Sequence, residues 1–214
     1  MNKPLFDDII QVNTTEKEVM ANTNDAFNIL LKTANKIKNE FASYPHDDKL
    51  SFQVNQNSPY VFEVSFGSDM LAFITHTEVY TLPKEHELSR MKYISQDKSK
   101  ANCGVIDIFN FLTSSFKYHR MDDTGALIGR ILVNKEKHFN VTGQKELAAI
   151  VNKFDKDVFD ETFAEEIINA AIKVALHLDI YIPTTTELNN VTLETFLSFR
   201  DKMQLRSGKK IGFK

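Results

Sequence analysis

The sequence of 214 residues predicts an α+β domain, in which an antiparallel meander of about six strands is packed by a long N-terminal helix and by C-terminal helices. Three observations lead to this prediction. Near both ends of the chain apolar residues recur every three or four positions, as on one face of a helix, whereas residues 50–143 are dominated by the two-residue alternation of strands. Short turns join the strand-like segments, which makes neighbouring strands antiparallel. Strands framed by helices are typical of the α+β class.

The first element is predicted to be one long amphipathic helix from Thr15 to Tyr44. Its apolar positions are Val19, Phe27, Leu30, Ala34, Ile37 and Phe41. Thr15 and Glu18 have the spacing of a capping box, which satisfies two backbone amides at a helix start. Pro45 directly follows the expected end, where a helix rarely continues.

Alternating residues then predict three strands, at residues 50–55, 61–66 and 70–82. A polar loop follows, and the segment "MKYIS" within this region is either a short strand or part of the loop. Three or four further strands are expected between Val105 and Gly143. Residues 105–112 are apolar on both faces, which requires helices on both sides of the sheet, or a helix on one side and a partner on the other.

Helical spacing returns in the last third of the chain. A short helix is predicted from Leu147, Ile150, Val151 and Phe154. A longer one is predicted from Phe163 to Leu178, with Asp160 as its N-cap, and a last helix begins at Thr192. The expected organisation is a single domain over residues 1–182, followed by a C-terminal helix and a basic tail over residues 183–214.

The stretch "MDDTGALIGR" at residues 121–130 contains the Asp-Thr-Gly loop that carries the catalytic carboxylate in retroviral-type aspartic proteases. Those enzymes need two such carboxylates, but the chain has no second Asp-Ser/Thr-Gly, and the Gly-Arg pair follows at once instead of far downstream. The stretch is therefore interpreted as the tip of a hairpin between alternating segments at 116–120 and 127–133. Walker, dinucleotide-binding, His-Glu-x-x-His and Gly-x-Ser-x-Gly motifs do not occur.

Asp107 is the most informative polar residue, because it shares one strand face with Val105 and Phe109. A carboxylate in such a place needs a partner or stays protonated, and Arg120 or Arg130 on neighbouring strands could supply one. Two interpretations stay open. Asp107 is either half of a buried ion pair that sets strand register, or an acid that lines a pocket.

Three histidines on the predicted strands are the remaining candidates for chemistry. If the meander gathers His76, His119 and His138 around Asp107, they form a metal or acid–base site. The simpler interpretation, which we prefer, is isolated strand histidines. Cys103 is likewise interpreted as a bystander thiol, and neither a metal nor a cofactor is predicted.

Charge is unevenly distributed along the chain. Residues 198–214 carry a net charge of +5, whereas the whole chain carries −3, so the rest carries −8. An acidic body repels a phosphate backbone, so nucleic-acid contact is expected only through this tail, for example at Lys209 and Lys210. One cysteine, no secretory signal and no long apolar run lead us to expect a cytoplasmic protein outside membranes.

The function that the sequence favours is a non-catalytic interaction or ligand-binding module that acts through a sheet face or groove. A homodimer or another protein partner is expected, and a small-molecule ligand is compatible with this function. Candidate binding residues are Arg120, Arg130, Lys209 and Lys210. The alternatives are a small hydrolase or metal-dependent enzyme that uses Asp107 and the strand histidines, and a nucleic-acid accessory protein that uses the basic tail.

Overall fold

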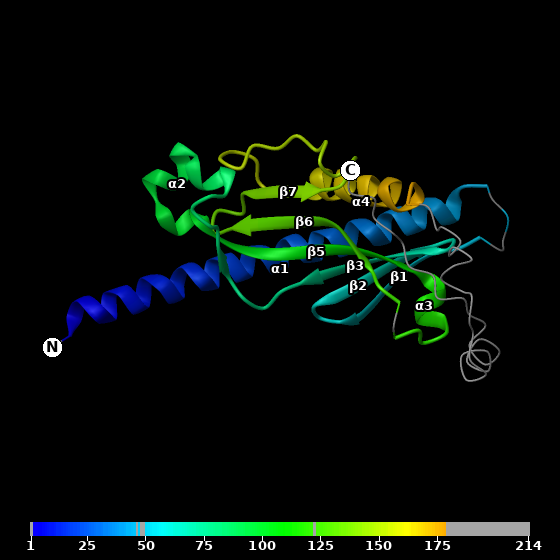
Figure 1. Ribbon diagram of the computed structural model, residues 1–214, viewed down its shortest axis with the longest axis horizontal. Helices are drawn as coiled ribbons and strands as arrows, with labels where there is room; N and C mark the ends of the chain where they lie inside the picture. The colour runs from blue at the N-terminus through cyan, green and yellow to red at the C-terminus, as the bar shows by residue number, and fades with distance from the viewer. Residues whose placement is uncertain (1, 46, 48–49, 122, 179–214) are drawn as a thin grey trace, which may run out of the picture.

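An antiparallel sheet forms the centre of the protein, whose computed structural model describes residues 2–45, 47, 50–121 and 123–178 (Figure 1). Its strands are β1 (Phe52–Ser58), β2 (Val61–Phe66), β3 (Asp69–Thr75), β4 (Tyr80–Thr81), β5 (Asn102–Leu112), β6 (Ala126–Asn134) and β7 (Phe139–Gly143). The order across the sheet is β1-β2-β3-β5-β6-β7, and the short β4 pairs with the start of β5. The predicted antiparallel meander and the α+β class are confirmed.

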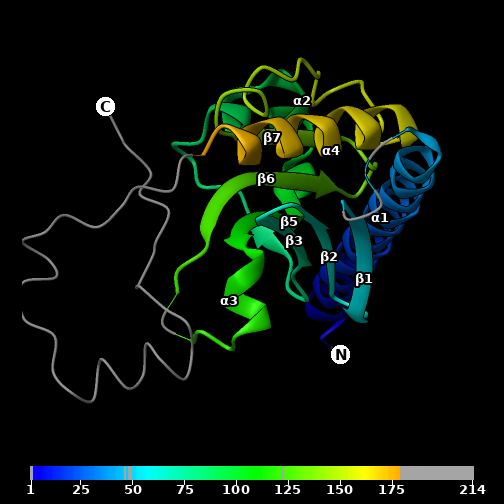
Figure 2. The ribbon, with the colours of Figure 1, turned by 90° about the vertical axis from the view of Figure 1, so that its right-hand side faces the viewer.

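One face of the sheet is covered by two helices, α1 (Lys3–Ser43) and α4 (Glu161–Leu176), which contact each other (Figure 2). Strand residues of one parity point to these helices and form the main core. Fully buried members are Phe62, Phe73, Ile106, Ile131 and Phe139 from the strands, and Leu30 and Ile167 from the helices. The predicted cap of α4 is confirmed, because an Asp160 carboxylate oxygen accepts a hydrogen bond from the Phe163 backbone N–H at 3.0 Å.

The predicted start of the first helix at Thr15 is wrong, because α1 already begins at Lys3. Pro4 lies in the first turn, where its missing N–H costs no helical hydrogen bond. Thr15 is inside the helix, and its hydroxyl donates to the Gln11 carbonyl at 3.0 Å instead of capping an end. Since Thr15 is also the first buried residue of α1, the helix extends well beyond the sheet at its N-terminal end (Figure 1).

The other face of the sheet is covered at one end by the segment 82–101, called the excursion below. It contains α2 (Lys92–Gln96) between two 3-10 turns (Glu87–Arg90 and Lys98–Ala101), so "MKYIS" belongs mostly to a short helix. Its apolar side chains pack on Val105, Leu132 and neighbouring residues to form a second, smaller core. The two-sided apolar character of β5 is thus matched by helices on one face and by the chain's own excursion on part of the other.

The segment after β5 differs from the predicted strand. It forms α3 (Thr113–Lys117), so Phe116 belongs to a helix, and Tyr118 and Arg120 follow that helix in no regular element. The helix stops where His119 takes a left-handed conformation with φ 49°, a common helix terminator.

The Asp-Thr-Gly stretch therefore ends a longer connection between β5 and β6 and is not the tip of a tight hairpin. Asp122 lies outside the described residues. Asp123 accepts hydrogen bonds from the hydroxyl of Ser115 at 2.6 Å and from Arg120 Nη1 at 3.4 Å. This carboxylate stabilises the connection, as the side chains of turns often do.

The short helix predicted at residues 147–154 is also wrong. Residues 145–149 form consecutive turns and no helix, and Lys145, the first of them, has a left-handed φ of 41°. Leu147 and Phe154 are nevertheless buried, which explains their helix-like apolar spacing. The helix expected from Thr192 and the basic residues Lys209 and Lys210 lie outside the described residues.

Candidate functional site

The sheet register places Asp107 of β5 directly opposite Arg130 of β6. Arg130 Nε donates to Asp107 Oδ1 at 2.6 Å and Nη2 donates to Oδ2 at 3.0 Å, a two-point contact of guanidinium and carboxylate. The Asp107 side chain is 4% exposed, whereas that of Arg130 is 46% exposed. The carboxylate is thus buried in the sheet, and the guanidinium lies over it at the surface.

His76 is the third member of this cluster. It directly follows β3, the neighbour of β5 on the other side, and its Nε2 lies 2.9 Å from Asp107 Oδ2. An ionised carboxylate only accepts hydrogen bonds, so Nε2 carries the hydrogen, and in the neutral ring Nδ1 keeps a lone pair. The ring of Tyr80 stands edge-on to His76, with 6.1 Å between ring centroids.

The contacts of Asp107 keep it ionised. Burial by itself raises the pKa of this carboxyl group, but hydrogen bonds from Arg130 and His76 outweigh burial and leave the pKa below its usual value. The same contact raises the pKa of the Arg130 guanidinium, with the hydrogen bond to Asp107 as the main cause. At neutral pH the pair of Asp107 and Arg130 is therefore a neutral unit with fixed geometry.

His76 and Arg130 lie at the polar side of a groove of about 500 Å³ between the sheet and the start of the excursion. Its other lining residues are Tyr80, Thr81, Leu82, Pro83, His86, Cys103, Val105, Leu132 and Thr142. Apolar groups dominate the floor and one wall, while the lining includes a guanidinium, two imidazoles and no carboxylate among the described residues. A concave apolar site with a few convergent polar groups has the usual composition of a small-molecule site.

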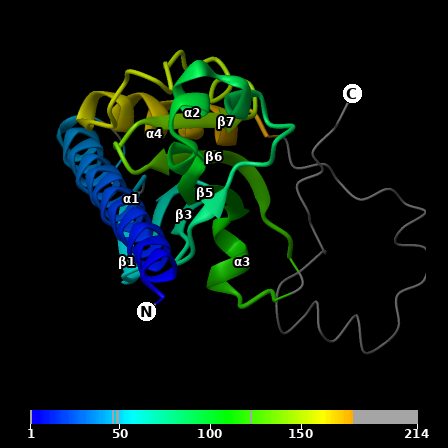
Figure 3. The same ribbon diagram turned by 90° about the vertical axis from the view of Figure 1, so that its left-hand side faces the viewer.

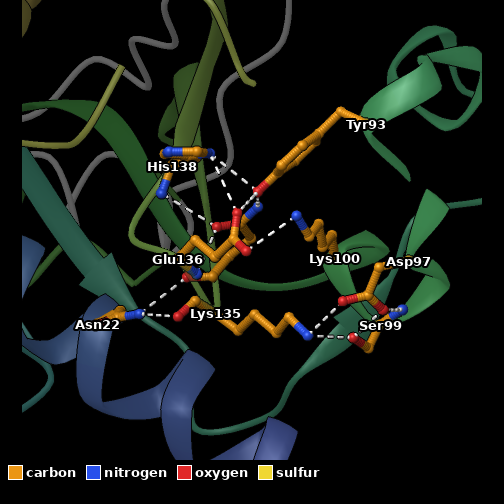
Figure 4. Close-up of polar contacts among 9 residues, drawn as sticks. Asn22, Tyr93, Asp97, Ser99, Lys100, Lys135, Glu136 and His138 are labelled. Carbon is orange, nitrogen blue, oxygen red and sulfur yellow. Dashed lines mark hydrogen bonds and ion pairs between the residues drawn. The ribbon is translucent and has the colours of Figure 1, made fainter. Parts of the chain in front are cut away.

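A second polar cluster connects the excursion to the hairpin of β6 and β7 (Figure 4). The hydroxyl of Tyr93 donates to Glu136 Oε2 at 2.6 Å and accepts from Asn134 Nδ2 at 2.9 Å. His138 Nδ1 lies 2.9 Å from the same hydroxyl, whose single hydrogen is already donated to the carboxylate. His138 therefore donates through Nδ1, and Lys100 Nζ pairs with Glu136 Oε1 at 3.0 Å.

The same cluster extends to α1 (Figure 4). Lys135 Nζ donates to Asp97 Oδ2 at 2.7 Å and to the Ser99 hydroxyl at 2.6 Å, and the Asn22 amide of α1 donates to the Lys135 carbonyl at 2.7 Å. These bonds hold the excursion against the body of the protein. Because the excursion begins with groove residues such as Leu82, they also stabilise the shape of the groove.

The structure separates most of the residues that the sequence singled out. It brings together Asp107, His76 and Arg130, whereas His138 belongs to the Tyr93 cluster. His119 lies beyond α3, and Arg120 pairs with Asp123 there. In the described part of the chain no three His, Cys, Asp or Glu side chains gather as possible metal ligands.

Most members of the second cluster were missed in the sequence, and so was Tyr80; Tyr80 and Tyr93 show why. Tyr80 gives no local signal, because its place beside His76 depends on the pairing of β4 with β5. Tyr93 lies in a short apolar segment, and its role depends on contacts 43 residues further along the chain. Cys103 lines the groove but is 1% exposed, and burial raises the pKa of its thiol to about 12.

Comparison with protein-family models, with curated proteins and with solved structures finds no match to this chain. Across the residues that the structure describes, no helix combines the length and apolar character needed to cross a membrane.

Proposed function

We propose that the protein is a non-catalytic binding module whose groove takes a small carboxylic acid with an apolar body. The observation that carries this proposal is the placement of Arg130 and His76, held on the buried Asp107 at the polar side of a groove of about 500 Å³. Volumes of about 300–1,000 Å³ are usual for small-molecule sites.

The guanidinium of Arg130 supports an anionic ligand. Nε and Nη2 donate to Asp107, and Nη1 has no hydrogen-bond partner among the described residues. Because Asp107 neutralises the charge of Arg130, the attraction comes from directed N–H donors and not from a broad positive field. This favours one small carboxylate over a polyanion such as nucleic acid, which needs many cationic contacts.

The rest of the groove supports an apolar ligand body. Val105 and Leu132 form part of the floor, and Leu82 and Pro83 come from the excursion. Burial of a ligand against such side chains releases about 25 cal/mol per Å² of apolar surface. We expect a ligand of about ten non-hydrogen atoms to bind with a dissociation constant in the millimolar range, and larger ligands to bind more tightly.

A titration with matched ligands tests the proposal. Phenylacetate and hexanoate should bind, whereas the neutral phenylacetamide and hexanamide should bind at least tenfold more weakly. Arg130→Gln should abolish the preference for the acid, and Arg90→Gln is the matched control, because Arg90 is exposed and outside the groove lining. Equal binding of acids and amides, or acid binding that survives Arg130→Gln, would overturn it.

A second variant separates binding from stability, because Arg130→Gln also disturbs Asp107. Thr142→Phe on β7 should fill part of the groove while it leaves the contact of Arg130 with Asp107 in place. Loss of phenylacetate binding with an unchanged unfolding midpoint is the expected result. Retained binding would show that the ligand lies elsewhere.

General-base catalysis is the second candidate, and the hydrogen bond from His76 to Asp107 favours it. A carboxylate that orients one imidazole nitrogen leaves the other to accept a proton, as in many hydrolases. Such a base would act on water and not on Cys103, the only thiol in the described groove, because this thiol is buried and its pKa is raised to about 12. Hydrolysis of p-nitrophenyl acetate that is lost in His76→Gln would favour this candidate.

The proposed setting is the cytoplasm, where a reducing compartment suits a buried free thiol. We also propose that the protein acts as a homodimer.

A further inference from the structure

The N-terminal end of α1 exposes a group of large apolar side chains. Residues 3–14, called the α1 arm below, are all exposed and extend past the sheet (Figures 1 and 3). Five large apolar side chains of the arm are between 47% and 63% exposed: Leu5, Phe6, Ile9, Ile10 and Val12. Isolated apolar side chains are normal at a surface, but a contiguous patch of this kind marks an interface.

The arm continues the stripe that packs into the core. Leu5, Ile9 and Val12 follow one another in steps of four and three, and the same steps lead on to the buried Val19 and Leu30. This spacing is that of a seam between two helices. Downstream the stripe packs on the sheet, whereas along the arm the sheet no longer lies beneath it.

The charge of the arm favours a protein partner over a membrane. Helices that lie on anionic membranes carry Lys or Arg along their polar face. The arm contains two acidic residues, Asp7 and Asp8, and one basic residue, Lys3, so its side chains carry a net charge of −1. An anionic lipid surface would repel it.

We propose that the α1 arm is the interface of a homodimer, in which the arms of two copies pair through this stripe. A twofold axis brings the same patch of both copies together, so one apolar stripe is sufficient. With Phe6 and Ile10, which lie beside the stripe on the helix, the arm has five large apolar side chains that expose roughly 100 Å² each, so burial of all five would remove about 500 Å² per copy and at most about 1,000 Å² in the pair. That area falls in the range of weak or transient protein interfaces, below the roughly 1,200 Å² of specific, stable ones.

The arm is already helical before it pairs with a second copy. Short isolated helices are marginal in water because the first turn is costly to form. Here the buried part of α1 has already formed the helix from which the arm extends. The small area nevertheless predicts a dissociation constant in the micromolar range, and the pairing is independent of ligand binding in the groove.

Sedimentation velocity of the full chain, from about 1 to about 200 µM, tests this proposal across the expected affinity range. The test variant is Ile9→Lys, which places a charge in the middle of the stripe. The control is Gln11→Lys, which adds the same charge within one turn but on the opposite helix face. Both positions are exposed, so both variants should unfold at the wild-type midpoint.

We expect the wild type and Gln11→Lys to form dimers as concentration rises, and Ile9→Lys to need at least tenfold higher concentration. A wild type that stays monomeric at the highest concentration would overturn the proposal. A dimer that both variants retain would also overturn the proposal, because a surface other than the arm would then form the dimer. Sedimentation of the wild type with phosphatidylserine vesicles, but not of Ile9→Lys, would identify the arm as a membrane anchor instead.

Discussion

Replacement of Asp107 by asparagine is the change that most directly perturbs the predicted site. The carboxylate accepts three hydrogen bonds: 2.6 Å from Arg130 Nε, 3.0 Å from Arg130 Nη2 and 2.9 Å from His76 Nε2. An asparagine side chain has one oxygen, and its amide group would face donors. In Asp107→Asn the His76 ring and the guanidinium therefore lose their common acceptor.

The size of the effect follows from burial. Hydrogen bonds to a charged group contribute about 1.5–3 kcal/mol each when both partners are buried. Here the side chains of His76 and Arg130 are 36% and 46% exposed, so in the variant water replaces part of the hydrogen bonding that they lose. We expect Asp107→Asn to lower the free energy of unfolding by about 2 kcal/mol. For a domain of this size the melting temperature should fall by about 4–8 °C.

The pH dependence of this loss is a sharper test than its size. Because the folded pKa of Asp107 lies below its usual value, the carboxylate stabilises the protein above the unfolded pKa of about 4. This contribution is lost as the pH falls through the folded pKa. Urea unfolding of wild type and variant should therefore differ most at pH 7 and converge in acid.

The control is Asp25→Asn, which breaks an ion pair with Lys137 in which the Asp25 side chain is 56% exposed. It should change the free energy of unfolding by less than about 1 kcal/mol. Equal stability of Asp107→Asn and wild type at pH 7, or a difference that grows in acid, would refute the reasoning.

Three other substitutions test the packing that supports the groove. Gly104→Ala would place a Cβ 2.0 Å from the fully buried Thr23 Oγ1, so we expect α1 to shift at a cost of about 1–3 kcal/mol in urea unfolding, with partial rescue by Thr23→Ala. Tyr93→Phe removes a hydroxyl that accepts from the side chains of Asn134 and His138 and donates to Glu136, and should cost about 1–2 kcal/mol and speed hydrogen exchange in the excursion; unchanged exchange would argue against its anchoring role. Hydrogen bonds from Lys135 and, to a smaller extent, from Ser99 lower the pKa of Asp97 to about 2. Asp97→Asn should therefore lower the free energy of unfolding by less than about 1 kcal/mol at pH 7, and this difference from the wild type should disappear between about pH 4 and pH 2. A cost for Asp97→Asn that persists at pH 2 would contradict this assignment.

The class and the strand order could be predicted because they depend on local periodicity and short turns. β1, β2 and β3 are joined by two-residue connections, which leave no alternative to antiparallel neighbours. Helix boundaries were harder to predict. The start at Thr15 was wrong because a capping-box pattern also occurs inside α1, where the helix simply continues.

The site was predictable only where strand register determines it. Asp107 and Arg130 form a cross-strand pair, and the alternation of β5 already indicated that this carboxylate needs a partner. Which arginine pairs with Asp107, Arg130 or Arg120, depended on whether residues 116–120 form a strand. They do not, because the left-handed turn at His119 ends α3 there. Residues from the excursion could not be placed, since their positions depend on contacts between distant segments.

The most direct test of the central claim is to map the site of phenylacetate binding on the wild-type protein by backbone amide chemical shifts. Binding in the groove predicts that the largest changes cluster at residues 76–83, 103–107 and 130–132, and that phenylacetamide at the same concentration leaves these amides nearly unchanged. The absence of changes, or changes that cluster away from Arg130, would contradict the claim that Asp107, Arg130 and His76 form a carboxylate-binding site.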